Sequence, residues 1–506
     1  MQRFLSAFLA AVMILALTGC NNTAQQDTTG ATWPSFTVPE TTVPAETVHV
    51  HEFSEATCTS PMICSCGTIE GTPLGHDYAD GVCFRCGAVP SNSDNNNDFV
   101  GDFGGGNSGS NQTGSNQAGS NQAGSSASLP DMLSQEQIDN FPIKTSNMSV
   151  LEMRDLCVSF FRFSKSVLWI STDTVEIPLN YNATSWETMP GGVLYGGLPY
   201  VGNTGNGNVY RMMDYYDPST GKLDIQRAMG SYPGLFGNHC SGAAYWGWAR
   251  VVNSAKYAFT ENMTHARGFL RVGPYTYDDS HTGFNKNFRT KTICTDNGKD
   301  TMFESYALVK PADGLVQYGT AGHVIMVSAD PVVVRNVDGS INANQSYLYV
   351  IEQTSGWVNN TNENGKEYNA KGYLDKKYAF ATLFSSGYIP FTFAEFLGTD
   401  PVEKTQCSST LSGSSVTLDQ IFSSSVKSNY AISDVYVLIS DGSGVVQKTM
   451  VKATAVHTMK LNLRNSGNNV DVWGKTDLGS GSYTVKIEAQ LGTGERITVY
   501  SGKLAN

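Results

Sequence analysis

The sequence lacks an excess of basic residues. Its 506 residues contain 33 Lys and Arg against 45 Asp and Glu, a formal net charge of −12, and only 15% of the residues are charged. A nucleic-acid-binding protein normally carries a basic face or stripe, so the composition argues against a nucleic-acid partner. Gly is abundant, at 51 residues, but lacks the strict three-residue period of collagen. Local clusters of Gly therefore indicate linkers.

The chain also lacks an apolar run of about 20 residues, the length that a membrane-spanning helix needs. Its apolar run at residues 4–17 follows one basic residue, Arg3, and is typical of an export signal. This run leads into Leu-Thr-Gly-Cys at residues 17–20, which resembles the bacterial lipobox, in which the Cys is acylated and becomes the mature N-terminus. The alternative is an ordinary secretory signal with an incidental Cys.

We therefore expect a lipoprotein signal peptide over residues 1–20 and a fatty acyl group such as palmitate on Cys20. A lipid anchor of this kind attaches a protein to the membrane without a spanning helix. The predicted location is the cell membrane of a bacterium, on its extracytoplasmic face.

Composition divides the rest of the chain into five segments. Of the 40 residues from 91 to 130, 28 are Gly, Ser, Asn or Gln, a composition that behaves as a flexible coil. The predicted segments are a disordered spacer at 21–48, a Cys/His segment at 49–89, a disordered linker at 90–130, an α+β domain at 131–400 and a small β-sandwich at 401–506.

The α+β expectation rests on helical patterns that precede strand patterns. Apolar residues at three- and four-residue spacing predict a leading helix over residues 148–170, and Ser149 with Glu152 is a candidate capping box. A second helix is predicted to start at His239. Strand-like runs follow at residues 322–327, 331–337, 347–353 and 378–384.

Alternating apolar residues and turn residues continue after Pro401. Residues 435–439 and 482–489 read as strands, and residues 441–444 and 478–481 read as turns. Short strands at this spacing over about 100 residues are typical of a small immunoglobulin-like sandwich.

The Cys/His segment holds five of the ten cysteines and an internal repeat, in which His51 and His76 each precede a Cys by seven residues. The segment resembles the zinc-ribbon-like Cys/His repeats of bacterial surface proteins. The candidate ligands of a structural zinc ion are Cys64, Cys66, Cys83 and Cys86. Disulfide pairing is the competing interpretation, because an exported protein permits it. In either case a segment this small needs a covalent or metal staple to fold.

A different cysteine carries the pattern of a nucleophile. Cys240 stands at the predicted start of a helix, where unpaired amide groups and the helix dipole favour a thiolate. His323 begins a predicted strand and could accept the proton. Glu352, on the next predicted strand, could hold the imidazole in its working tautomer. The neighbouring residue Gln353 competes for this last role, because a one-residue shift in register exchanges the two side chains.

These motifs resemble the NlpC/P60 family of papain-like cysteine peptidases, which cut the stem peptides of bacterial cell walls. The family's Cys-Ser-Gly and Gly-His-Val motifs match residues 240–242 and 322–324, and its Gly-x-Pro-Tyr stretch matches residues 197–200. The chain departs from the family at His239, where Asp is usual, and in the separation of Tyr200 and Cys240, which are 40 positions apart.

The resemblance implies helices packed on an antiparallel sheet and no cofactor for catalysis. It implies a cysteine peptidase or amidase that hydrolyses peptidoglycan, with Cys240, His323 and Glu352 as catalytic residues and with Tyr200 and Ser241 near the oxyanion and the substrate. The competing interpretations are a core position for Cys240, a structural His323, and a non-catalytic lipoprotein that binds the cell wall or its glycans.

Overall fold

The computed structural model describes residues 131–179, 184–202, 207–229, 237–263, 266–277, 289–319, 322–362, 364–398, 402–462, 478 and 480–505, together with the backbone of four short strands before residue 90. The chain divides into two units, Met1–Gly119 and Ser120–Asn506. In the first unit, β1 (Met62–Ile63) pairs with β2 (Ile69–Glu70), and β3 (Tyr78–Ala79) pairs with β4 (Val82–Cys83), both antiparallel. Each half of the predicted Cys/His repeat thus contains one hairpin.

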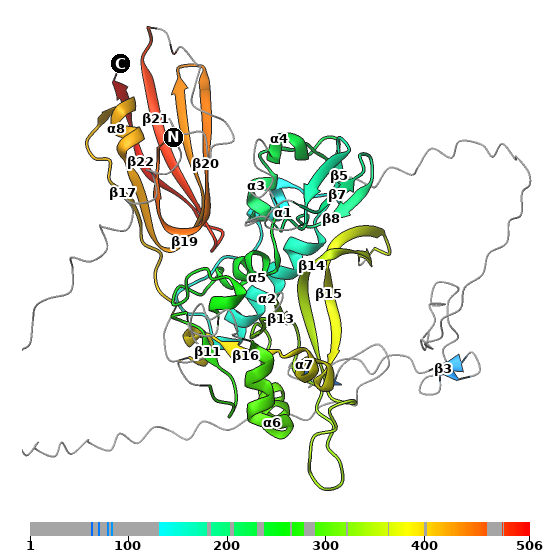
Figure 1. Cartoon of the computed structure of the whole chain (residues 1–506). Helices are drawn as coiled ribbons and strands as arrows, with labels where there is room; N and C mark the ends of the chain where they lie inside the picture. The colour runs from blue at the N-terminus through cyan, green and yellow to red at the C-terminus, as the bar shows by residue number, and fades with distance from the viewer. Residues whose placement is uncertain are drawn as a thin grey trace, which may run out of the picture. The chain divides into compact units, whose positions relative to one another are not determined.

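The second unit is mixed α+β and is built on a ten-stranded sheet (Figure 1). The strand order is β11-β16-β12-β13-β14-β15-β8-β5-β10-β9. The strands are β5 (Leu168–Ser171), β8 (Leu194–Gly196), β9 (Tyr216–Asp217), β10 (Lys222–Leu223), β11 (Leu270–Arg271), β12 (Gly314–Gln317), β13 (His323–Val327), β14 (Tyr347–Thr361), β15 (Glu367–Ala379) and β16 (Ile389–Thr392), with a separate hairpin of β6 (Val175–Pro178) and β7 (Trp186–Met189).

The helices of this part are α1 (Gln135–Asp139), α2 (Val150–Ser166), α3 (Val209–Met212), α4 (Ile225–Met229), α5 (Cys240–Trp248), α6 (Thr290–Ala307) and α7 (Phe380–Ser386), with short 3₁₀ turns at Thr260–Asn262 and Ala394–Leu397. The helices α2 and α5 pack on each other, α5 contacts β13 and β14, and α2 contacts β15. Figure 1 shows α2 and α5 side by side next to these strands.

The predicted sheet was antiparallel, and this is correct for all but two of its strand pairs. The pairs β12–β13, β13–β14, β14–β15 and β12–β16 are antiparallel, whereas β8 joins β15 and β10 joins β5 in parallel. The sheet is therefore mixed. Each parallel pair joins two strands that are far apart in the sequence, β5 with β10 and β8 with β15.

The predicted leading helix is confirmed as α2. Its N-cap, Ser149, accepts a hydrogen bond from the backbone N–H of Glu152, and the Glu152 carboxylate accepts one from the N–H of Ser149. This is the capping box that the sequence suggested. The second predicted helix is α5, which starts one residue later, with His239 as its N-cap.

Two of the four predicted strands are wrong. Residues 331–337 form only two isolated bridges, because the chain turns back at residues 336–340. Residues 378–384 contain the end of β15 and then α7, in which Phe380 and Leu383 are buried at helical spacing. Short apolar runs do not distinguish a buried helix from a strand.

Where the structure describes it, the carboxy-terminal part consists of strands and one short helix. Its elements are β17 (Cys407–Ser409), β18 (Ser415–Thr417), α8 (Leu418–Ser423), β19 (Ser425–Asp441), β20 (Gly444–Lys460), β21 (Tyr483–Leu491) and β22 (Arg496–Ala505). All six strands join one sheet, in the order β17-β19-β21-β22-β18, with β20 on β19. The two stacked sheets expected of a sandwich are therefore replaced by one curled sheet.

Burial along β19 shows what covers each face of this strand. Residues 430–437 are buried without interruption, as expected of a strand that is covered on both faces. Tyr436 belongs to the core shared with the α+β part, whereas Val435 and Val437 belong to the separate core of the sheet. One face of β19 thus packs against the α+β part, and the other face lines the core of the curled sheet itself.

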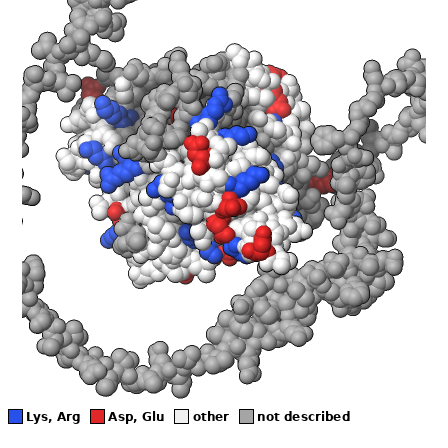
Figure 2. Space-filling model, turned by 60° about the horizontal axis from the view of Figure 1, so that its bottom comes forward, with Lys and Arg blue, Asp and Glu red and all other residues white. Residues whose placement is uncertain are grey.

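The surface carries charges of both signs. On the face drawn in Figure 2, acidic and basic side chains lie interspersed among uncharged ones. This agrees with the low charged fraction of the sequence, 15%.

Candidate active site

Cys240 is the first residue of α5. Its N-cap, His239, has an extended backbone, with φ −103° and ψ 180°. The first N–H groups of a helix have no partner within the helix, and the positive end of the helix dipole lies there. Both effects favour a thiolate at this position. Cys240 is 6% exposed, so its sulfur lies just beneath the surface.

His323 and Glu352 lie on neighbouring antiparallel strands, β13 and β14. Nε2 of His323 is 3.0 Å from Oε2 of Glu352. Hydrogen bonding and charge between the imidazole and the Cys240 thiol shift the pKa of both groups, so the two side chains are close together. The structure therefore brings together the thiol, the imidazole and the carboxylate that sequence analysis singled out.

The carboxylate of Glu352 is held by three donors on two strands. Besides His323, Lys376 donates to Oε1 at 2.8 Å and the Tyr378 hydroxyl donates to Oε2 at 3.1 Å. Both come from β15, where alternate residues face the same side. Glu352 itself is 1% exposed. A buried carboxylate needs such partners, because an unpaired buried charge is strongly unfavourable.

Gln353 has a different role from Glu352. Its carboxamide nitrogen donates to the backbone oxygens of Leu198, at 3.2 Å, and of Asn238, at 3.4 Å. It therefore supports the segment that leads into the nucleophile, and only Glu352 reaches His323. The register ambiguity left by the sequence is resolved by the pairing of β14 with β15, which places Glu352 opposite Tyr373 and Gln353 opposite Gly372.

The three groups shift each other's protonation. Burial raises the pKa of Cys240, but hydrogen bonds to His239 and His323 and the charges of these rings outweigh it and lower the pKa to about 5. Burial lowers the pKa of His323, but hydrogen bonds and charge interactions with Cys240 and Glu352 raise it to about 10. Near neutral pH the pair is thus a thiolate and an imidazolium.

The pKa of Glu352 is also set by two opposing effects. Burial raises the pKa of its carboxyl, but His323 and Lys376 outweigh burial and hold the pKa below its usual range. The carboxylate is therefore ionised beside the imidazolium. Its negative charge stabilises the proton on His323.

Tyr200 and Ser241 are both brought near Cys240, by strand pairing and by sequence respectively. Tyr200 forms an isolated parallel bridge with Asn238, two residues before Cys240. Burial and the nearby charge of Cys240 raise the pKa of Tyr200 to about 12, so its hydroxyl keeps its proton. Ser241 is 2% exposed, and its Oγ lies 2.9 Å from Nδ1 of His239.

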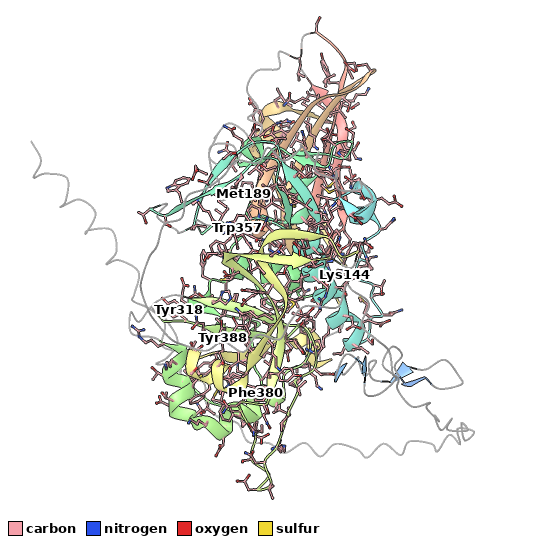
Figure 3. The ribbon with its side chains drawn as sticks, turned by 90° about the vertical axis from the view of Figure 1, so that its right-hand side faces the viewer. Lys144, Met189, Tyr318, Trp357, Phe380 and Tyr388 are labelled. Carbon is pink, nitrogen blue, oxygen red and sulfur yellow. The ribbon has the colours of Figure 1, made fainter. Side chains whose placement is uncertain are left out.

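Sequence reasoning missed several neighbours of the triad. Lys376 and Tyr378 stand in a stretch with a second lysine, Lys377, and no motif marks which side chain faces Glu352. The hydroxyl of Tyr257 lies 3.0 Å from Nε2 of His239, from a segment 18 residues later. Tyr388, labelled in Figure 3, is 4% exposed, and burial and the charges of Tyr378, Glu352 and Cys240 raise its pKa. These contacts arise only when distant segments pack together.

The other described cysteines differ from Cys240. Cys157, Cys294 and Cys407 are free thiols, and burial raises the pKa of each, to about 12 for Cys294 and about 11 for Cys407. A buried thiol with a raised pKa is inert at neutral pH. Among the four described cysteines, Cys240 alone has a lowered pKa.

Several predictions fall outside the described residues. These are the signal peptide and Cys20, the spacer, the linker, and the side chains of the candidate zinc ligands Cys64, Cys66, Cys83 and Cys86. Within the part of the chain that the structure describes, no group of three or more His, Cys, Asp or Glu side chains is arranged to hold a metal ion. In that same part, every helix is too short or too polar to span a membrane.

Comparison with known proteins adds little. No protein-family model matches the chain, and no curated protein matches it. Among solved structures, a tetra-tandem repeat in the extending region of a large adhesion protein is similar over 39% of this chain and 68% of that chain, at 13% identity and a TM-score of 0.15. Similarity this low carries no argument about fold or function.

Proposed function

We propose that this protein is a cysteine hydrolase in which Cys240 is the nucleophile, His323 the acid and base, and Glu352 the residue that orients the imidazole. The observation that carries the proposal is an imidazole whose Nε2 lies 3.0 Å from a buried carboxylate and which helps to lower the pKa of the Cys240 thiol. This is the arrangement of a nucleophile, a base and an orienting group.

In the first half of the proposed reaction, the Cys240 thiolate attacks the carbonyl carbon of an amide. A C–S bond forms, and the carbonyl electron pair moves to oxygen. The oxyanion then collapses, the C–N bond breaks, and the imidazolium of His323 gives its proton to the leaving amine. The proposed oxyanion donors are the Cys240 backbone N–H and the Tyr200 hydroxyl, and such a donor contributes about 3 to 4 kcal/mol.

In the second half, His323 is neutral and accepts a proton from water. The water oxygen attacks the thioester carbon, the C–S bond breaks, and the thiolate is restored together with the imidazolium. The products are a carboxylic acid and an amine. Glu352 keeps its negative charge throughout and stabilises the imidazolium at the start and end of the cycle.

The proposed substrate class rests on the sequence resemblance. A helix-borne Cys-Ser-Gly followed by a Gly-His-Val strand is the NlpC/P60 pattern, and we propose a papain-like fold of that kind for residues 131–400. The proposed substrate is therefore a peptide bond of peptidoglycan. The proposed setting is a lipoprotein held on the outer face of the cell membrane through Cys20.

The proposal is tested by incubating the full-length protein with purified peptidoglycan and analysing the released fragments by mass spectrometry. We expect Cys240→Ala to abolish the release, His323→Ala to reduce it by at least about a hundredfold, and Glu352→Gln to reduce it less. Fragment masses identify the bond that is cut and separate peptidase from amidase activity.

Cys407→Ser is the matched control, because it removes a half-buried thiol that lies outside the site, and we expect full activity. Release by Cys240→Ala at the wild-type rate would refute the nucleophile. If the wild-type protein binds peptidoglycan but releases nothing, the protein is a wall-binding lipoprotein that uses this fold as a scaffold.

A further inference from the structure

The ammonium of Lys376 is held beside the candidate triad by a carboxylate and two aromatic rings. Its Nζ donates to Oε1 of Glu352 at 2.8 Å. The same nitrogen lies 4.5 Å from the ring centre of Tyr373 and 4.7 Å from that of Tyr378. A cation within about 6 Å of an aromatic ring centre is attracted by the face of the ring. These contacts hold the ammonium in place, although the side chain is 34% exposed.

A β-bulge in β15 brings these side chains to Glu352. Val350 of β14 pairs with Lys376. Glu352, two residues later on β14, pairs with Tyr373, which lies three residues before Lys376 on β15. The extra residue on β15 makes a β-bulge, a feature that re-aims the side chains beside it. The side chain of Lys376 and the ring of Tyr373 therefore meet beside Glu352.

The two oxygens of the Glu352 carboxylate have different partners. Oε2 accepts from the Tyr378 hydroxyl at 3.1 Å and lies 3.0 Å from Nε2 of His323. Oε1 accepts from Lys376. Lys376 therefore does not compete with His323 for the same oxygen. Its positive charge acts on the imidazole across the carboxylate, and a nearby like charge disfavours the charged form of a titratable group.

Further titratable groups act on the pair of His323 and Glu352 from three places in the described chain: Lys376 and Tyr378 on β15, Cys240 at the start of α5 and Tyr388 just before β16. Burial raises the pKa of both tyrosines, so their hydroxyls are neutral. Burial lowers the pKa of Lys376, but Glu352 outweighs it and raises that pKa, so the amine is charged. The thiolate and the carboxylate favour a proton on His323, and the Lys376 ammonium opposes it.

We propose that Lys376 is a positioning residue of the hydrolase, which holds Oε1 of Glu352 and weakens the attraction of the carboxylate for the proton on His323. The inference rests on the proposed roles of His323 and Glu352. An imidazolium that binds its proton less tightly is a stronger acid, and His323 has to give this proton to the leaving amine when the C–N bond breaks. Glu352 thus orients the ring, while Lys376 keeps the ring acidic enough to protonate the amine.

The test is an NMR titration of His323 in the full-length protein with labelled histidine, carried out on the Cys240→Ala background, with His323→Gln to assign the signal. Removing the thiol takes away a group that raises the pKa of His323, which is about 10 in the wild type, so the titration moves to a milder pH. On this background Lys376→Met should raise the pKa of His323 by at least about one unit. Lys376→Arg keeps the charge and should bring the pKa back toward the background value.

Lys377→Met is the matched control, because Lys377 is the next residue of β15 and faces the other side of the strand, with its ammonium 3.6 Å from the ring centre of Tyr347. We expect it to leave the pKa of His323 unchanged. With Cys240 present, Lys376→Met should lower kcat on soluble peptidoglycan fragments by about three- to tenfold and leave KM near the wild-type value. Thermal unfolding of each variant separates a change of charge from loss of folding.

The inference is overturned if Lys376→Met leaves the pKa of His323 at the background value, because Lys376 then only packs beside Glu352. It is also overturned if Lys376→Arg raises this pKa as much as Lys376→Met does, or if kcat of an active protein is the same with and without Lys376. The titration is independent of hydrolysis. A wild-type protein that releases nothing from peptidoglycan, while His323 titrates as expected, would refute the proposed function and leave the effect of Lys376 on His323 in place.

Discussion

Glu352 and Lys165 are two buried charged residues with opposite surroundings. Glu352 has His323, Lys376 and Tyr378 as donors. Lys165, in the last turn of α2, is 2% exposed and has no hydrogen-bond or ion-pair partner among the described residues. Burial lowers the pKa of Lys165 to about 7. The carboxylate is thus stabilised as an ion, whereas the amine is stabilised in its neutral form.

The pKa of Lys165 predicts a pH-dependent stability. Between pH 7 and pH 10.5, the unfolded chain binds a proton that the folded chain lacks, so the free energy of unfolding rises with pH across this window. Lys165→Met removes the cost of charging the buried amine. We expect it to raise the free energy of unfolding at pH 7 by about 1 to 4 kcal/mol, with a gain that shrinks toward pH 10.5.

Urea unfolding followed by circular dichroism at several pH values measures this gain. Lys299→Met is the control, because Lys299 is exposed on α6, and its effect should stay within about 0.5 kcal/mol at every pH. A gain for Lys165→Met that is the same at pH 7 and pH 10 would show that charge is not its cause.

At the scale of single elements, the residue before each helix determines how the first backbone N–H groups of that helix are satisfied. Three described helices begin with a full capping box, namely α1, α2 and α8. The helix α5 begins instead with His239, whose ring accepts a hydrogen bond from the backbone N–H of Gly242. The same local rule thus stabilises the first turns of α2 and α5.

The capping box of α2 predicts the effect of one substitution. Ser149→Ala removes the oxygen that accepts from the N–H of Glu152, and we expect it to lower the free energy of unfolding by about 1 kcal/mol. Ser146→Ala, three residues earlier, removes an exposed hydroxyl with one long contact to Asn147 and should change little. Chemical denaturation of both variants checks the difference, and equal effects would contradict the role of the cap.

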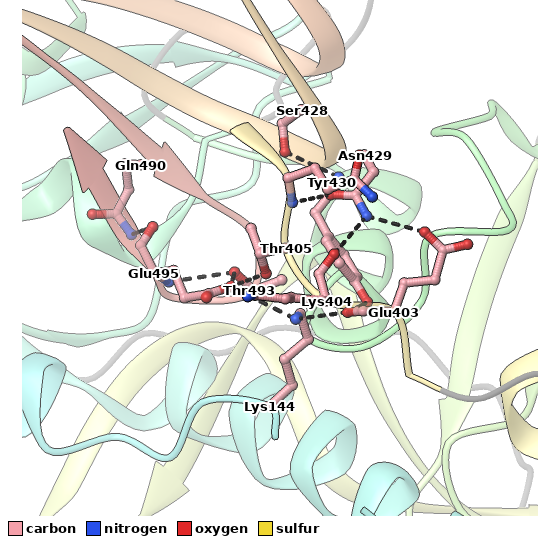
Figure 4. A network of polar contacts seen from close by, with 11 residues as sticks. Lys144, Glu403, Lys404, Thr405, Ser428, Asn429, Tyr430, Gln490, Thr493 and Glu495 are labelled. Carbon is pink, nitrogen blue, oxygen red and sulfur yellow. Dashed lines mark hydrogen bonds and ion pairs between the residues drawn. The ribbon is translucent and has the colours of Figure 1, made fainter. Parts of the chain in front are cut away.

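Over the whole of the second unit, the carboxy-terminal sheet is joined to the α+β part through buried polar contacts. Lys144 donates to the backbone oxygen of Glu403 at 3.1 Å and lies 3.8 Å from the carboxylate of Glu495 (Figure 4). Its ammonium also lies 4.4 Å from the ring centre of Tyr430. Burial lowers the pKa of Lys144, and the two carboxylates oppose the shift.

A second buried contact between the carboxy-terminal sheet and the α+β part lies next to the segment that precedes Cys240. Arg211 of α3 forms an ion pair with Asp434 of β19 at 2.8 Å, and both side chains are at most 1% exposed. The residue before α3 is its N-cap, Asn208, and the preceding Gly207 donates to the backbone oxygen of Gly237 at 2.9 Å. Asn238 donates back to the oxygen of Gly207 at 3.2 Å. The sheet therefore supports the segment that leads into Cys240.

The buried ion pair predicts a large and asymmetric mutational effect. Arg211→Ala leaves the Asp434 carboxylate buried without its main partner and should lower the free energy of unfolding by about 3 to 5 kcal/mol. Combining Arg211→Met with Asp434→Leu removes both charges and should recover most of that loss. Arg335→Ala breaks an exposed pair with Glu304, which water screens, and should lower the free energy of unfolding far less than Arg211→Ala.

Equilibrium unfolding in urea measures the three variants. Equal losses for Arg211→Ala and Arg335→Ala would contradict the buried ion pair. Alkylation of Cys240 in the double variant also reports whether the site survives when the charges are replaced.

The structural features that the sequence determined by itself depend on neighbouring residues or on a periodic pattern. The capping box of α2, the helix start at Cys240 and the strand that begins at His323 follow from neighbouring residues, and each is observed. The motif also identified Glu352 as a partner for His323, leaving Gln353 as the alternative. A pattern that spans a few residues is enough for predictions of this kind.

The tertiary structure decided the rest, because it depends on contacts between residues far apart in the chain. The helix α7 took the place of a strand once Phe380 and Leu383 had a core to face, and one face of the carboxy-terminal sheet packs against the core of the α+β part. Packing also set the partners of Glu352. The ammonium of Lys376 reaches its carboxylate through strand pairing that no short motif encodes.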